Sequence, residues 1–180
     1  MNVCVFCGSS VGSDPAFSEA ATELGNLLAK NNCTLVFGGG KVGLMGVIAD
    51  AVLRNSGKAI GVIPHFLYQR EVGHDGLSEL EIVQSMHERK KRMADLSDCF
   101  IAMPGGWGTL DELAEILTWR QLGLVSGPIG LLNTRSFFDP LLTQLDQMTA
   151  KGFVSQANSK TLIVGKDPVQ LLTMLGVVTV

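Results

Sequence analysis

Charged residues are scarce in this sequence: Asp, Glu, Lys and Arg make up 17% of its 180 residues, whereas about 25% is typical of a soluble domain. Long apolar runs are lacking too, since no run reaches the roughly 18 residues of a membrane span. The net charge of −3 argues against the strongly basic face that a broad nucleic-acid footprint requires. We therefore expect neither nucleic acid nor a membrane among the partners of this protein.

Signals for secretion, redox chemistry and metal binding are also missing. Residues 1–7 have strand character and lack the basic start and cleavage site of a signal peptide, which predicts a cytoplasmic protein. Cys4 and Cys7 have C-x-x-C spacing, but within a strand they point to opposite faces, so we expect buried free thiols. The three histidines (His65, His74 and His87) lack metal-ligand spacing and no Cys/His cluster is present, so we expect no metal and no cofactor.

Apolar residues, by contrast, are abundant at 46% of the chain. A chain of 180 residues predicts a single domain, residues 1–180, with a proper core. One domain of this size cannot easily hide so much apolar surface alone. We therefore expect a subunit interface, with a homodimer as the simplest case.

Short apolar runs alternate with helical patterns from end to end, which predicts β-α-β units. The expected strands are 3–7, 34–37, 59–63, 80–84, 99–103, 129–132 and 161–164. The expected helices are 15–31, 44–56, 86–96, 109–122, 138–151 and 168–175. The strands are continuously apolar, so both faces of the sheet must be covered. The sequence predicts the α/β class: a Rossmann-like three-layer fold with a parallel sheet and helices on both faces.

Ligands of such sheets bind at the carboxyl ends of the strands, and two of these ends are rich in glycine. After the second strand, residues 38–43 match G-x-G-x-x-G, yet no acidic residue follows at the distance that a dinucleotide site requires. Val42 also stands where a P-loop has Ser or Thr. Two interpretations remain open: a tight turn that lets the helix pack on the sheet, and a floor on which a ligand lies.

The second glycine loop, Pro104-Gly105-Gly106-Trp107-Gly108-Thr109, follows the fifth strand. Its three glycines leave the backbone amides open and allow positive φ, and the helix expected from Thr109 directs its positive dipole end to the same space. These features predict an anion site of the kind that holds a phosphate.

Two acidic residues, Asp111 and Glu112, lie close to that anion site. Thr109-x-x-Glu112 also matches a capping box, in which Glu112 would only bind the cap amide. A capping box needs no glycine triplet before it, and a phosphate directly on these carboxylates would be repelled. We therefore place the phosphate on the glycine amides and Glu112 beside the sugar of a nucleotide.

The fourth strand leads into a basic helix at residues 86–93. Helical spacing places Arg89 and Lys90 beside the apolar stripe, whereas Lys91 and Arg92 fall on the far side, where we expect solvent. A charge beside an apolar face is costly without a partner. An anionic ligand in the cleft would be such a partner for Arg89 and Lys90.

These motifs, Met86-x-x-Arg89-Lys90-x-x-Met93 and Pro104-Gly105-Gly106-x-Gly108-Thr109-x-x-Glu112, resemble those of the LOG family. These are the cytokinin-activating "lonely guy" proteins, long labelled possible lysine decarboxylases. The resemblance covers nearly the whole chain. Trp107 stands where Tyr is more usual in the family, and Asp111 where Glu is common.

The resemblance implies a Rossmann-like, commonly dimeric hydrolase of the N-glycosidic bond of nucleoside 5′-monophosphates. Its products are a free base, often an N6-modified adenine, and ribose 5-phosphate. By resemblance, Arg89 and Glu112 are the catalytic pair. The substrate contacts that it implies are Glu71, Arg89, Lys90, Gly105, Gly106, Trp107, Gly108, Thr109, Leu110, Asp111, Glu112 and Thr118.

Two questions remain open from the sequence. Arg89 has two available roles, neutralising the departing base or gripping the phosphate with two hydrogen bonds. A non-catalytic nucleotide carrier or sensor is the alternative function; it would keep the glycine loop but need neither Arg89 nor Glu112. A lysine decarboxylase would need a pyridoxal phosphate site, which the sequence does not offer.

Overall fold

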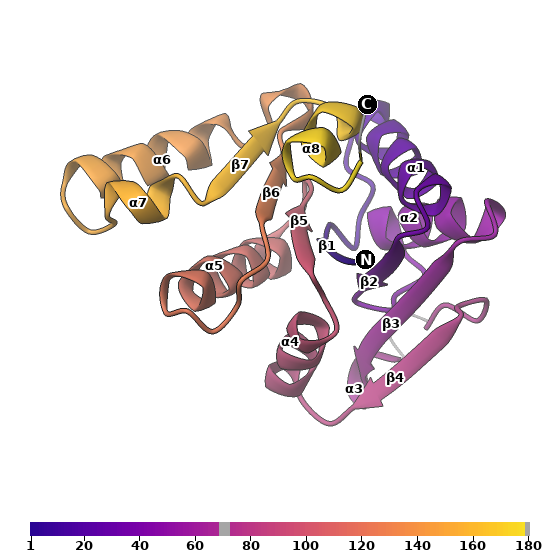
Figure 1. The fold of residues 1–180 in the computed structure, drawn as a ribbon. Helices are drawn as coiled ribbons and strands as arrows, with labels where there is room; N and C mark the ends of the chain where they lie inside the picture. Colours follow the sequence, from indigo (N-terminus) through magenta and orange to yellow (C-terminus); the bar gives the residue numbers. More distant parts are fainter. Residues whose placement is uncertain (69–72, 179–180) are drawn as a thin grey trace.

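A seven-stranded parallel sheet forms the centre of the computed structural model, which describes residues 1–68 and 73–178 (Figure 1). The strands are β1 (Asn2–Phe6), β2 (Thr34–Phe37), β3 (Lys58–Pro64), β4 (Glu79–Val83), β5 (Cys99–Ala102), β6 (Ile129–Leu132) and β7 (Leu162–Gly165). Their order in the sheet is β4-β3-β2-β1-β5-β6-β7, and every neighbouring pair is parallel. All seven predicted strands are confirmed, to within one residue at either end.

Helices connect the strands as the alternation predicts. They are α1 (Pro15–Lys30), α2 (Gly43–Arg54), α3 (His65–Tyr68), α4 (Met86–Asp95), α5 (Trp107–Gln121), α6 (Asp139–Ala150), α7 (Gln156–Ser159) and α8 (Pro168–Met174), with a 3-10 turn η1 (Thr134–Ser136). The short elements α3, α7 and η1 are additions to the predicted set. α3 follows β3 directly and could not be predicted, because a single helical turn leaves no apolar periodicity to detect.

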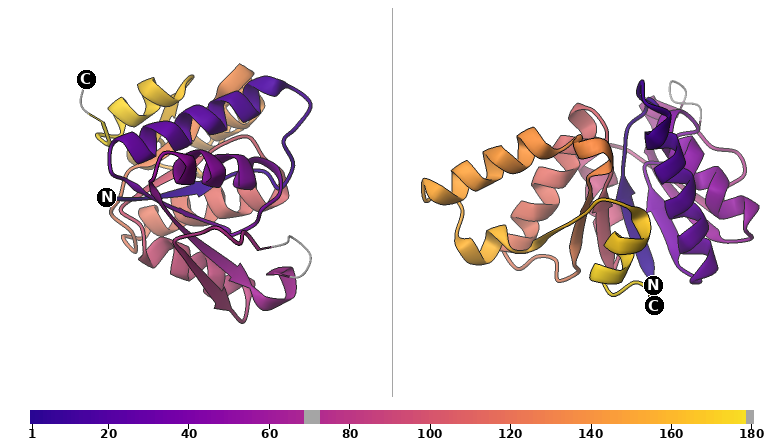
Figure 2. Two further views of the ribbon diagram at one scale, coloured as in Figure 1. Left: turned by 90° about the vertical axis from the view of Figure 1, so that its right-hand side faces the viewer. Right: turned by 90° about the horizontal axis from the view of Figure 1, so that it is seen from above.

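Helices lie on both faces of the sheet, as the view from above in Figure 2 shows, and each face carries its own hydrophobic layer. α1, α2 and α8 pack on one face around Leu24, Ile48 and Leu171. α4 and α5 pack on the other around Met93 and Leu113. The predicted three-layer α/β fold is therefore confirmed.

Strand β1 shows how the sequence divides its side chains between these layers. Val3 and Val5 belong to the layer under α1 and α2, as does Cys7 just beyond the strand, whereas Cys4 and Phe6 belong to the layer under α4 and α5. The prediction that Cys4 and Cys7 face opposite sides is confirmed, and both thiols are buried and free. In the part of the chain that the structure describes, no helix is long and apolar enough to cross a membrane.

The strand order reverses between β1 and β5, which are neighbours at the centre of the sheet. Their carboxyl ends are joined by backbone hydrogen bonds: Met103 N–H donates to Phe6 O at 2.8 Å, and Gly8 N–H donates to Pro104 O at 3.1 Å. A reversal of this kind opens a crevice at the carboxyl edge of a parallel sheet. The second glycine loop follows β5 directly and therefore lies at that crevice.

Candidate active site

A pocket of about 140 Å³ lies at the reversal point of the sheet. It is lined by Val5, Phe6, Cys7, Gly8, Ser9, Gly38, Met45, Arg89, Gly106, Trp107, Gly108, Thr109 and Glu112. The carboxyl ends of β1 and β2 supply part of the lining, and α2, α4 and the start of α5 supply the rest. Residues far apart in the sequence thus meet where a ligand of this fold class binds.

The first turn of α5 forms one wall of the pocket. The helix begins at Trp107 with Gly106 as its N-cap, two residues before the predicted start at Thr109. Thr109 is therefore the third residue of the helix, and the capping box with Glu112 does not form. No side chain caps this end, so the first amides of the helix have no acceptor within it and are available to an anion.

The glycines of this loop leave room for a ligand. A Cβ built on Gly106 or Gly108 would meet nothing within 4 Å, whereas one on Gly105 would lie 2.1 Å from Thr109 Oγ1. Gly105 therefore serves close packing, and Gly106 and Gly108 keep space open beside the helix amides. The expected positive φ is absent from this loop: the residues with positive φ lie elsewhere, and Gly106 has a φ of −101°.

The first glycine loop forms a tight turn, and one of its residues lines the pocket. Gly39 has a φ of +74°, which is typical of a tight turn. A Cβ added to Gly39 would lie 3.3 Å from Ile63 Cβ, so a side chain at this position would be crowded by β3. Gly38 also lines the pocket, and its carbonyl oxygen accepts a hydrogen bond of 2.8 Å from Arg89 Nη2. The loop is therefore a close-packed turn and part of the pocket wall.

Arg89 is a buried cation, with 5% of its surface exposed. Its Nε donates to Val62 O at 3.1 Å, its Nη2 donates to Gly38 O, and its Nη1 contacts Met86 Sδ at 3.9 Å. These contacts fix the plane of the guanidinium against the pocket. Arg89 also lines the pocket, so its charge is presented to an anionic ligand that enters there.

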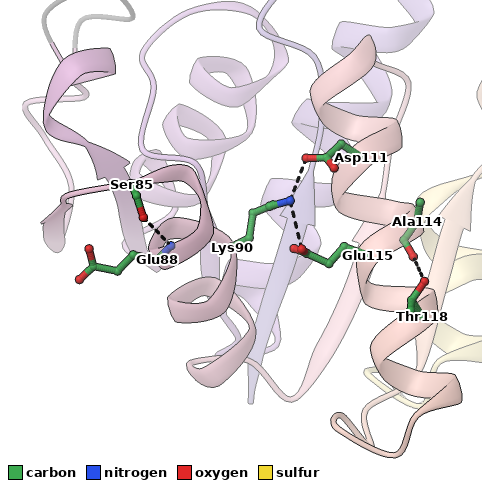
Figure 3. Close-up of polar contacts among 7 residues, drawn as sticks. All are labelled: Ser85, Glu88, Lys90, Asp111, Ala114, Glu115 and Thr118. Carbon is green, nitrogen blue, oxygen red and sulfur yellow. Dashed lines mark hydrogen bonds and ion pairs between the residues drawn. The ribbon is translucent and has the colours of Figure 1, made fainter.

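Lys90 points to the neighbouring helix instead of the pocket (Figure 3). Its Nζ lies 3.0 Å from Asp111 Oδ2 and 3.1 Å from Glu115 Oε1, and only 10% of its side chain is exposed. Burial acts to lower the pKa of Lys90, but the two carboxylates outweigh it and raise that pKa. The ammonium therefore stays charged, with its counterions supplied by α5.

The other two cations of this helix differ from each other. Lys91 is exposed and pairs with Asp95 on its own helix, in keeping with the expected solvated face. Arg92 does not simply face solvent as we expected, because its guanidinium donates to both carboxylate oxygens of Glu81, at 2.6 and 2.8 Å. These hydrogen bonds lower the pKa of Glu81. Arg92 therefore ties α4 to the edge strand β4.

Glu112 brings a carboxylate to the pocket from the second turn of α5. The half-buried side chain lies close enough to Cys7 that its negative charge adds to burial in raising the pKa of that thiol. Cys7 is thus a neutral wall residue. The pocket combines a carboxylate, a buried guanidinium and open helix amides, which is a set able to hold a phosphate and stabilise positive charge on an attached sugar.

A larger groove of about 340 Å³ lies outside this set, between α5, α6 and α7. Its lining is mostly aliphatic and includes Leu113, Leu117, Leu145 and Met148. It has no charged side chain among its lining residues, so it offers no chemistry to an anion. The smaller pocket is therefore the candidate active site despite its size.

Comparisons with known proteins establish the family of this chain. The family model described as possible lysine decarboxylase matches residues 45–175. Cytokinin riboside 5′-monophosphate phosphoribohydrolase LOG7 of Arabidopsis thaliana is 43% identical over 96% of this chain and 80% of its own length. The chain belongs to the LOG family. A probable enzyme of the same name, LOGL2 of Oryza sativa subsp. japonica, is 44% identical over 96% of this chain and 71% of its own length.

Solved structures share the fold of this LOG family chain at lower identity. The molybdenum cofactor carrier protein of Chlamydomonas reinhardtii superposes with a TM-score of 0.74 at 19% identity, over 97% of this chain and 95% of its own. The molybdenum cofactor binding protein of Rippkaea orientalis has a TM-score of 0.73 at 21% identity, over 97% and 94% of the two chains. Identities this low establish the fold alone.

The structure gathers about half of the substrate-contact residues expected for a LOG family protein into the pocket. Those that line it are Arg89, Gly106, Trp107, Gly108, Thr109 and Glu112. Leu110 and Thr118 line the apolar groove, and the Thr118 hydroxyl donates to Ala114 O at 2.8 Å. Asp111 pairs with Lys90, and Gly105 packs behind the loop. Glu71 lies outside the described residues.

The sequence analysis missed Gly8, Ser9 and Met45, which also line the pocket. Gly8 and Ser9 follow the central strand directly, so the rule that ligands bind at carboxyl ends would have indicated them. Met45 belongs to the apolar pattern of α2 and carries no sequence signal for a site. No group of three or more potential metal ligands occurs within residues 1–68 and 73–178.

Proposed function

We propose that this LOG family chain hydrolyses the N-glycosidic bond of nucleoside 5′-monophosphates, AMP or N6-modified cytokinin riboside 5′-monophosphates, to a free base and ribose 5-phosphate. The observation that carries the proposal is the pocket in which the uncapped α5 amides, Arg89 and Glu112 meet. The relatives that are 43–44% identical and carry the name of this activity support it.

The phosphate binds at the start of α5 in this proposal. The amides of the first helical turn have no intrahelical acceptor, and the helix dipole adds positive potential there. The space beside Gly106 and Gly108 is open. A doubly charged phosphate monoester fits this site better than a neutral nucleoside does, so the phosphate anchors the ribose within reach of Glu112.

Cleavage of the ribosyl C–N bond develops positive charge at C1′ as the electron pair leaves with the base. The Glu112 carboxylate stabilises that charge and accepts a proton from the attacking water, which adds its oxygen to C1′. The base takes up a proton and leaves, so that water is divided between the two products. Arg89, which lines the same pocket, supplies a fixed positive charge to the anionic substrate.

A substrate panel and one substitution test this function. Purified protein is expected to release base from 5′-monophosphates and to lose most activity on the parent nucleosides, because they lack the anchoring phosphate. Glu112→Gln keeps the shape of the side chain but lowers kcat by about 100-fold or more. Base release is measured by chromatography.

Glu19→Gln, on the exposed face of α1, is the matched control and keeps full activity. If no monophosphate in the panel releases its base, the proposed hydrolase activity is refuted and the carrier or sensor alternative is favoured. Full activity in Glu112→Gln would instead refute the role of this carboxylate alone.

We also propose that two copies of the chain associate through the apolar groove between α5, α6 and α7. α6 has no fully buried residue, although it carries Leu145 and Met148 toward the groove. Leu122 and Leu124, just beyond α5, are 64% and 67% exposed. Figure 1 shows α6 and α7 at one end of the molecule, and exposed apolar surface of this kind favours association with a partner.

The remaining expectations complete the proposal. We infer that residues 1–180 act as one domain in the cytoplasm, without a cofactor and without nucleic-acid or membrane partners. The acidic balance of the chain supports the absence of a nucleic-acid partner.

A further inference from the structure

Lys90 and Arg89 are adjacent in sequence, yet they leave α4 in different directions. Successive residues of an α-helix are separated by about 100°. Arg89 extends to Gly38, directly after β2, and to Val62 within β3, and it donates a hydrogen bond to the carbonyl oxygen of each. Lys90 extends across to α5, where its ammonium lies between Asp111 and Glu115, as Figure 3 shows.

The two carboxylates that pair with Lys90 belong to Asp111 and Glu115, which lie on either side of Glu112 in the sequence of α5. Asp111 precedes Glu112 directly, and Glu115 lies three residues after it, one turn along the helix. Glu112, Lys90 and Glu115 also border the same small void beneath the pocket. The ion pairs therefore join the residue next to Arg89 to the residues on both sides of Glu112.

We propose that Lys90 is a positioning residue, which clips α4 to α5 and thereby sets the placement of Glu112 relative to Arg89. This inference rests on the proposed function, and it replaces a direct contact between Lys90 and the phosphate.

The charges around Lys90 favour a role in joining α4 to α5 over direct binding of the phosphate. Lys90 has one positive charge and already faces two carboxylates, so the cluster as a whole is negative. A phosphate brought to the ammonium would be repelled by Asp111 and Glu115. The side chain is also nearly buried, which strengthens its pairing and keeps it away from the pocket lining.

The test compares kcat with the binding of ribose 5-phosphate, the phosphate-bearing product. Lys90→Met is expected to lower kcat about 10- to 100-fold on AMP, because a small misplacement of a catalytic group has an effect of this size. Binding of ribose 5-phosphate, measured by calorimetry, should change less than 2-fold. Glu115→Gln should lower kcat in the same direction, and the double variant should lose less than the product of the two single losses.

Lys91→Met is the matched control, because Lys91 is the next residue of α4 and pairs only within that helix. It should leave both kcat and ribose 5-phosphate binding unchanged. Glu115→Gln and Asp111→Asn keep the test valid even where Lys90→Met fails to fold, which circular dichroism reveals.

Three results would overturn the inference. Ribose 5-phosphate binding that weakens 10-fold or more in Lys90→Met but not in Glu115→Gln would identify Lys90 as a phosphate ligand. Unchanged kcat in both folded variants would leave the ion pairs without a positioning role. A wild-type protein that releases no base would remove the proposed function itself, a failure distinct from the other two because it is seen before any substitution is made.

Discussion

Arg89 illustrates how a buried charge can be held ready for a ligand. Its guanidinium donates to the backbone carbonyls of Gly38, in the loop after β2, and of Val62, in β3, so the side chain has one orientation. Carbonyl oxygens satisfy the N–H groups but supply no full negative charge. Arg89 lines the pocket, whereas the charge of Lys90 is balanced by two carboxylates of α5.

Gly105 and Gly108 offer a matched pair of substitutions. Gly108→Ala should keep or slightly raise the free energy of unfolding, because its Cβ has open space and Ala favours a helix. The same methyl group would occupy the space proposed for the phosphate, so KM should rise about 10-fold, which steady-state kinetics on AMP measures.

Gly105→Ala is expected to behave in the opposite way. Its Cβ would clash with Thr109, which should cost about 1–3 kcal/mol of unfolding free energy in denaturant titrations. Unchanged KM in Gly108→Ala would contradict the location of the phosphate site.

Among the helices, α5 has the most consequences for function. Its start at Trp107 removes Thr109 from the cap and leaves the first turn to a ligand. α4 differs, because Ser85 caps it by accepting a hydrogen bond from Glu88 N–H at 3.1 Å. The first turn of α5 lines the pocket and lacks a side-chain cap, which leaves its amides available to an anion.

The end of α2 allows a test of helix stability away from the site. Ser56 follows the C-cap with a φ of +57° and is exposed. Glycine adopts this conformation without strain, so Ser56→Gly should raise the free energy of unfolding by about 1 kcal/mol. Thermal and denaturant unfolding both measure this change.

Asn32, after α1, is the comparison for Ser56 because its φ is +53°. Asparagine tolerates this region better than serine does, so Asn32→Gly should stabilise by less. A loss of stability in Ser56→Gly would show that the conformation of this turn depends on the serine side chain.

The proposed pairing of two copies concerns the apolar groove, which Lys90 does not line. Leu145→Asp would place a charge in the apolar groove. Because a buried unpaired charge is costly, the dissociation constant of the dimer should rise by about 100-fold or more. Sedimentation at micromolar concentration should then show a monomer.

Val169→Asp, on α8 at the other face of the sheet and 44% exposed, is the control and should leave association unchanged. A wild-type protein that sediments as a monomer would refute this pairing and leave the apolar groove without an occupant from the same chain.

Much of this LOG family protein follows from local sequence patterns. Every strand position could be predicted because continuous apolar runs between helical patterns have few other solutions, and the glycines after β5 indicated the site. The pocket-lining positions of Arg89, Gly106, Gly108 and Glu112 agree with that prediction. These features depend on the chemistry of neighbouring residues, which the sequence displays directly.

Tertiary packing decided the rest. Two adjacent cations, Arg89 and Lys90, looked alike beside an apolar stripe, but one meets carbonyl groups and the other meets carboxylates of a different helix. Thr118 shares a helix with Glu112 yet lies in the apolar groove. Partners of this kind come from segments distant in the chain, and a side chain's charge acquires its role only when the fold determines which groups surround it.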